Sequence, residues 1–141
     1  MTTCPTAATD NGGCCAPPVA PTATAASGIT KSIITGGEFT ANWNAVGGAT
    51  SYRLDISLSS TFASFVVNNL NVGNVTSHTK TGLDCSVTYY YRVRAFNGCA
   101  SSNSNTITVV MTSCNVCAQQ ACEFTFGYGE WQCMCNACSC P

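Results

Sequence analysis

The stretch YYYRVRA at residues 89–95 decides the fold class, because its apolar and polar side chains alternate. Successive side chains of a β-strand point to opposite faces, so the odd-numbered residues of this stretch face a core and the even-numbered ones face outward. The same period of two recurs on either side, at 39–43, 52–56 and 106–109. Gly and Asn pairs separate these runs, and no stretch has helical periodicity. The pattern predicts an all-β fold, an antiparallel sandwich or barrel.

Composition divides the 141 residues into three segments. Residues 1–20 are a Cys- and Pro-rich N-terminal arm that ends in an extended, polyproline-type linker. Residues 21–111 carry the strand pattern and are long enough for one sandwich of about 90–100 residues. Residues 112–141 are a Cys-rich C-terminal tail, in which residues 123–132 indicate a short β-hairpin.

Charge is scarce in this chain. Only 8% of the residues are charged and the formal net charge is -1. Without a basic stripe, nucleic acid is not an expected partner. A surface of Ser, Thr, Asn and Gly has little repulsion, so it suits either dense packing in an assembly or a secreted domain.

Two features bear on where the chain is found. It has no run of about 18 apolar residues, so membrane insertion is not expected. The start of the chain does not have the pattern of a secretory signal. We therefore expect a mature product with an added start Met, export by another route, or a virion component.

The central segment resembles the fibronectin type III family over about 90 residues. Trp43 stands where the family places its strand B tryptophan, and Tyr52-Arg53-Leu54 is similar to the strand C motif. Thr81-Gly82-Leu83 followed by Tyr89 is similar to the corner before strand F, whereas Asp84-Cys85-Ser86 replaces the usual Pro-Gly. Residues 104–109 are similar to strand G. The resemblance implies a single antiparallel, immunoglobulin-like sandwich in which the Tyr89 hydroxyl bonds to backbone near Leu83.

Twelve cysteines indicate a disulfide scaffold in an oxidising compartment or a metal-binding protein in a reducing one. We predict disulfides for all of them: Cys4, Cys14, Cys15, Cys85, Cys99, Cys114, Cys117, Cys122, Cys133, Cys135, Cys138 and Cys140. Residues 89–95 are similar to strand F and lie between Cys85 and Cys99. The about 13 residues between the two cysteines span roughly 40 Å when extended, far beyond the ~7 Å between Cα atoms that a disulfide allows. In the implied fold, Cys99 lies near Cys4, Cys14 and Cys15, and Cys85 lies near the start of the C-terminal tail. We predict a bond from Cys99 to Cys14 or Cys15 and a bond from Cys85 to Cys114 or Cys117. The bonds could lie within one chain or bridge subunits.

The alternative for the C-terminal cysteines is a metal site. Cys114 and Cys117, together with Cys133, Cys135, Cys138 and Cys140, have spacings found in thiolate sites for soft ions. The segment contains no His and no Lys, which favours disulfides, so we predict no cofactor.

The tail also holds surplus aromatic residues. A 30-residue segment cannot bury Phe124, Phe126, Tyr128 and Trp131 by itself, so we expect these four to form an interface with the sandwich or with a neighbouring subunit.

No catalytic constellation is visible. His78 is the only histidine, and the six carboxylates are scattered. We therefore predict a non-enzymatic structural subunit of an extracellular assembly (a filament, surface layer or virion appendage) whose partners are copies of itself or other subunits. The alternatives are a secreted monomeric adhesion or binding module and a thiolate metal-binding protein.

Overall fold

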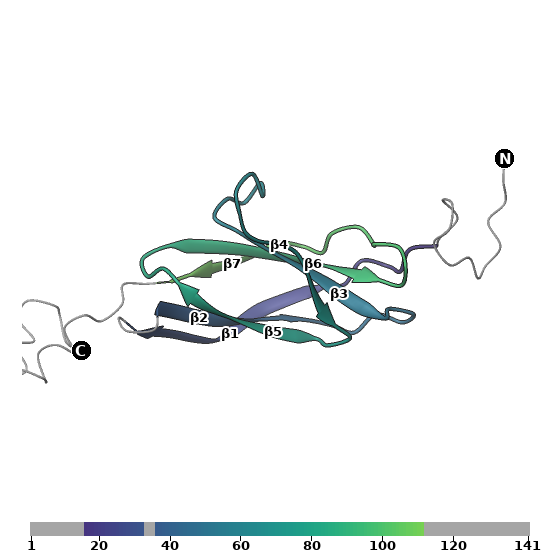
Figure 1. The fold of residues 1–141 in the computed structure, drawn as a ribbon, viewed down its shortest axis with the longest axis horizontal. Helices are drawn as coiled ribbons and strands as arrows, with labels where there is room; N and C mark the ends of the chain where they lie inside the picture. The colour runs from purple at the N-terminus through teal and green to yellow at the C-terminus, as the bar shows by residue number, and fades with distance from the viewer. Residues whose placement is uncertain (1–15, 33–35, 112–141) are drawn as a thin grey trace, which may run out of the picture.

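The computed structural model describes residues 16–32 and 36–111, which form two antiparallel β-sheets packed face to face (Figure 1). In one sheet the order is β1-β2-β5, with bounds Ala23–Ser32, Gly36–Trp43 and Ser77–Leu83. In the other the order is β4-β3-β6-β7, with bounds Phe65–Gly73, Ser51–Ser57, Thr88–Phe96 and Ile107–Val110. The predicted all-β sandwich is confirmed.

The hydrophobic core lies between the sheets and follows the alternation read from the sequence. The four odd-numbered residues from Tyr89 to Ala95 in β6 are all buried, and the even-numbered residues between them are half-buried on the outer surface. Phe39 of β2 stacks on Tyr91 of β6, with ring centroids 5.8 Å apart. Trp43 contacts Tyr52 of β3 in a tilted arrangement at 5.7 Å. Each aromatic pair joins the two sheets, so much of the apolar area that stabilises the fold is buried at these contacts.

Buried tyrosines keep their hydroxyl groups on the backbone, which removes the cost of an unpaired buried polar atom. The Tyr89 hydroxyl accepts a hydrogen bond from the Asp84 amide at 2.8 Å, and the Tyr52 hydroxyl accepts one from the Val46 amide at 2.7 Å. The Tyr91 hydroxyl donates to the Thr24 carbonyl of β1 and accepts from the Asn42 amide of β2 at 3.2 Å. The predicted bond from Tyr89 to the corner near Leu83 is confirmed.

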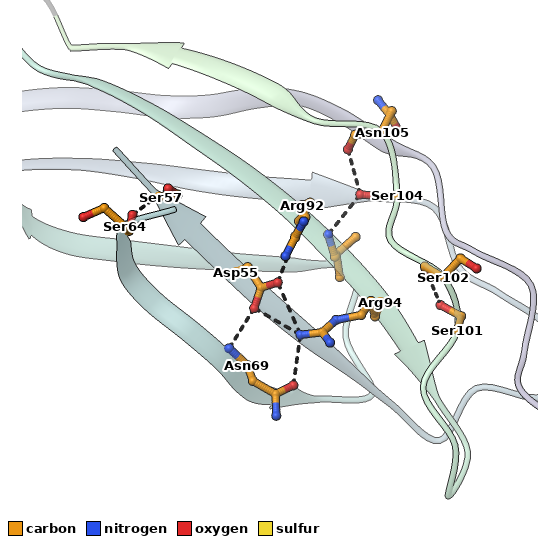
Figure 2. Close-up of polar contacts among 11 residues, drawn as sticks. Asp55, Ser57, Ser64, Asn69, Arg92, Arg94, Ser101, Ser102, Ser104 and Asn105 are labelled. Atoms are coloured by element: carbon orange, nitrogen blue, oxygen red, sulfur yellow. Dashed lines mark hydrogen bonds and ion pairs between the residues drawn. The ribbon is translucent and has the colours of Figure 1, made fainter. Parts of the chain in front are cut away.

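β7 pairs with β6 only from Thr88 to Tyr91, and the remaining backbone amides on that side of β6 bond to serine side chains. The Ser104 hydroxyl accepts from the Val93 amide at 2.9 Å, and the Ser101 hydroxyl accepts from the Ala95 amide at 2.9 Å. Asn105 then bonds both the amide and the carbonyl of Ala23, at 2.9 and 3.0 Å, and so ties this connection to β1. Figure 2 shows Ser101, Ser104 and Asn105 along this connection. Residues 101–105 therefore act as an irregular extension of the sheet.

The described chain enters and leaves at opposite ends of the sandwich (Figure 1). At the entry end, the Asn97 side-chain amide donates to the Ala16 carbonyl at 3.0 Å, so residue 16 lies beside the connection between β6 and β7. At the exit end, the Met111 amide donates to the carbonyl of Val87 at 3.0 Å, and Val87 lies just before β6. We call these ends the entry pole and the exit pole.

Candidate functional site

Each pole carries one disulfide-bonded cysteine. Cys99 lies at the entry pole, three residues after the end of β6, and Cys85 lies at the exit pole in the turn between β5 and β6. Both side chains are half-buried and both are disulfide-bonded. The turn around Cys85 is fixed by the bond from the Asp84 amide to Tyr89 and by Ser86, whose φ of 61° lies in the left-handed region.

The two cysteines cannot bond to each other within one sandwich. The nine residues of β6 lie between them, and at ~3.3 Å per residue an extended strand of that length spans roughly 30 Å. A disulfide needs Cα atoms within ~7 Å. No other cysteine occurs in the described ranges 16–32 and 36–111. The partner of each bond therefore lies outside the described residues or in another molecule.

The remaining predicted site residues lie outside the described part of the chain. These are Cys4, Cys14, Cys15, Cys114, Cys117, Cys122, Cys133, Cys135, Cys138 and Cys140, together with the tail aromatics Phe124, Phe126, Tyr128 and Trp131.

A polar cluster on the outer surface of the four-stranded sheet is the second candidate site (Figure 2). Asp55 of β3 is only 1% exposed. Its carboxylate accepts hydrogen bonds from Arg92 Nε at 3.0 Å, from Arg94 Nη2 at 3.1 Å and from the backbone amide of Asn69 at 2.7 Å. Two arginines therefore surround one buried carboxylate and leave an excess positive charge near the surface.

Two residues beside this cluster, one in β4 and one in the connection before β4, have unusual backbone conformations. Asn69 has a φ of 55° and Phe62 a φ of 57°, both in the left-handed region. Asn adopts this region readily, whereas Phe rarely does, so surrounding contacts must hold Phe62 in place. The Phe62 ring lies 4.0 Å from the Arg92 guanidinium, a cation–π contact. Arg53 makes a similar contact with Phe96 at 4.7 Å.

Sequence reasoning missed this cluster. It treated the six carboxylates as scattered, whereas the register of β3 on β6 sets Asp55 opposite Arg92 and Arg53 opposite Arg94. The signal was available in the alternation of both strands, which predicted Arg92 and Arg94 on the outward face, but the register was needed to bring Asp55 between them.

No group of three or more His, Cys, Asp or Glu side chains comes together within residues 16–32 and 36–111. His78 is half-buried on β5, paired with Ala41 of β2.

Burial raises the pKa of Tyr89 and of Tyr91 above the ordinary value for tyrosine, so both hydroxyls stay neutral hydrogen-bonding groups. The part of the chain that the structure describes also contains no helix that is long and apolar enough to cross a membrane.

The two-sheet arrangement is that of the fibronectin type III fold. A human fibronectin type III domain superposes with a TM-score of 0.51 at 18% identity, covering 67% of this chain and 74% of the other. Domains of titin superpose with a TM-score of 0.52 at 20% identity, covering 68% and 32%. A β-1,2-glucanase from Parabacteroides distasonis contains a similar region, with a TM-score of 0.53 at 15% identity, covering 69% of this chain and 14% of the enzyme. At these identities the likeness shows the fold.

Sequence comparison adds one relative. A Kelch domain-containing protein of Saccharolobus solfataricus is 34% identical over 100 residues, which cover 71% of this chain and 12% of the relative. The chain thus spans about an eighth of the length of that curated relative. No family model matches the chain.

Proposed function

We propose that this chain is a non-enzymatic structural subunit of an extracellular assembly, held together by disulfides at both poles of its sandwich. The assembly is a filament, a surface layer or a virion appendage, and the partners are copies of the chain or other subunits. The observation that carries the proposal is the pair of disulfide-bonded cysteines, Cys85 and Cys99, at opposite ends of one rigid domain. Fibronectin type III domains are often extracellular, where such bonds persist.

Each pole suggests a particular bonding partner. Ala16 follows Cys15 directly, and its carbonyl is bonded to Asn97 close to Cys99. This supports a bond from Cys99 to Cys14 or Cys15. Met111 is bonded to Val87, two residues from Cys85, which supports a bond from Cys85 to Cys114 or Cys117. A bond of either kind to the same segment of a neighbouring chain would turn a row of sandwiches into a covalent fibre.

The edge of the four-stranded sheet also suits an assembly. β4 lies at this edge, has no charged side chain, and exposes Phe65, Val66 and Leu70 by 38–41%. Edge strands of solitary domains are usually protected by Lys, Pro or inward-pointing charges, because unpaired backbone groups recruit other strands. An apolar, uncharged edge favours contact with another chain.

Electrophoresis without reductant, combined with the mass in solution, tests the proposal. We expect species larger than a monomer that reductant converts to monomer. A monomer band with and without reductant, together with a monomer mass in solution, would contradict the structural-subunit proposal.

A secreted monomeric adhesion or binding module is the second candidate. It is supported by the occurrence of similar regions as single modules within longer chains, since the matched region covers 12% of the Kelch domain-containing protein and 32% of the titin chain. Binding of a discrete ligand by a monomer would favour this candidate.

A thiolate metal-binding protein is the third candidate. Elemental analysis of protein purified without oxidation separates it from the other two, since zero bound metal and no free thiol would exclude it.

A further inference from the structure

The outer face of the four-stranded sheet concentrates positive charge. We define this outer face by six residues: Arg53, Phe65, Tyr90, Arg92, Arg94 and Val110. Three of the five Lys and Arg side chains of the whole chain lie here. The carboxylate that faces them from the same sheet is that of Asp55, which is already bonded to Arg92 and Arg94. Three guanidinium groups against one buried carboxylate leave two uncompensated positive charges in a chain of net charge -1.

The same face is apolar toward the exit pole. Val110 is 56% exposed and Phe65 is 41% exposed. Tyr90 lies between them, because Ser57 is paired with both Phe65 and Tyr90, and β7 borders β6 on its other side. A surface that combines exposed aromatic and aliphatic side chains with arginines has the composition of a protein-binding site.

One segment of this chain has the complementary composition. Residues 123–131 contain Phe124, Phe126, Tyr128 and Trp131 together with Glu123 and Glu130. Residues 112–141 contain two Glu and no Asp, Lys, Arg or His, so the count of side-chain charges is -2. This charge equals the excess of opposite sign on the outer face, and aromatic rings are the groups that an apolar rim with arginines holds best.

The route of the chain also favours this occupant. Val110 is itself part of the outer face, and the chain leaves β7 one residue later. The eleven residues 112–122 span at most roughly 35 Å at ~3.3 Å per residue, which is enough to reach any position on a sheet four strands wide at about 4.8 Å per strand. A tether this short gives an effective concentration in the millimolar range.

We propose that residues 123–131 dock on the outer face of their own sandwich. The aromatic side chains cover Phe65, Tyr90 and Val110, and Glu123 and Glu130 pair with guanidinium groups of the face. The proposal does not rest on the function proposed above, since a subunit of an assembly and a monomeric module could both carry a docked tail. Of the exposed side chains at the β4 edge it covers Phe65 and leaves Val66 and Leu70 for contact with another chain.

Photo-crosslinking in the full chain tests this. With Tyr90→p-benzoylphenylalanine, or Val110→p-benzoylphenylalanine as a second site in case the first variant is destabilised, irradiation should join the face to residues 123–131 within one chain. Mixing heavy-isotope and normal chains distinguishes the occupants by mass spectrometry. Crosslinks between heavy and normal chains, which mean a second copy, would overturn the proposal, as would crosslinks that never involve residues 123–131.

A matched control and a charge variant sharpen the result. The same photo-reactive residue at Thr79, exposed on the opposite sheet, should give no product with residues 123–131, and equal yields at Thr79 and Tyr90 would overturn the proposal. Replacing Glu123→Gln together with Glu130→Gln should lower the ratio of docked to undocked chains about fivefold at low salt, the effect of two exposed ion pairs of ~0.5 kcal/mol each. An unchanged ratio would remove the electrostatic basis and overturn the assignment.

Discussion

The Asp55 cluster makes a sharp prediction about stability. In the Asp55→Asn variant the shape is kept, and the side-chain oxygen can still accept the Asn69 amide that Asp55 accepts at 2.7 Å. The negative charge is lost, so Arg92 and Arg94 remain close together without a counter-charge. Removing one partner of a buried ion pair costs about 3–5 kcal/mol. The arginine side chains are 23% and 24% exposed, so solvent screens part of this, and we expect a loss of about 2–3 kcal/mol.

Urea unfolding followed by circular dichroism measures this loss, with the slope of the transition unchanged. Asp84→Asn is the matched control, because Asp84 is an exposed carboxylate in a turn and its replacement should change the free energy of unfolding by less than about 0.5 kcal/mol. Combining Asp55→Asn with Arg94→Gln should cost less than the sum of the single changes. A loss below about 0.5 kcal/mol in Asp55→Asn would refute the reasoning that the carboxylate stabilises the sheet.

The other predictions concern hydrogen bonds and pH. Tyr89→Phe removes the acceptor of the Asp84 amide and should lower the free energy of unfolding by about 1 kcal/mol in urea titrations, and a neutral result would mean that the corner is held by packing alone. Asn105→Ala removes two bonds to Ala23 and should cost about 1 kcal/mol, whereas Asn103→Ala, an exposed neighbour, should cost little. Because burial raises the pKa of Tyr89 and Tyr91, their stabilising contribution is complete below about pH 10, where the unfolded tyrosines ionise, and is lost as the pH rises above that value. The urea concentration at the midpoint of unfolding should therefore decrease as the pH is raised from about 9 to about 11. The decrease should be less steep in Tyr89→Phe than in the parent chain, and equal dependence on pH in the two proteins would contradict the assignment to Tyr89.

The core could be predicted from the sequence because its signals are local. Alternation in residues 89–95 assigned an inward or outward face to each side chain of β6, and Trp43, Tyr52 and Tyr89 carried the family resemblance. Each of these residues meets its partners through the period of a strand and the packing of two sheets, which sequence patterns encode directly.

Features that depend on pairing between distant segments could not be predicted. The bonds from Ser101 and Ser104 to β6 depend on how an irregular connection follows a strand. The bonds around Asp55 depend on the register of β3 against β6 and on a left-handed residue in β4. Residues such as Asn69 carry no periodic signal, because a single left-handed residue in a strand is set by its surroundings.

The most direct measurement is mass-spectrometric mapping of the disulfides in the unreduced protein, digested at acidic pH to prevent exchange. If the two poles are tied separately, Cys85 and Cys99 will be recovered in different linked peptides, with Cys99 joined to Cys14 or Cys15 and Cys85 joined to Cys114 or Cys117. Recovery of a Cys85–Cys99 peptide, or of both residues as free thiols, would contradict this arrangement.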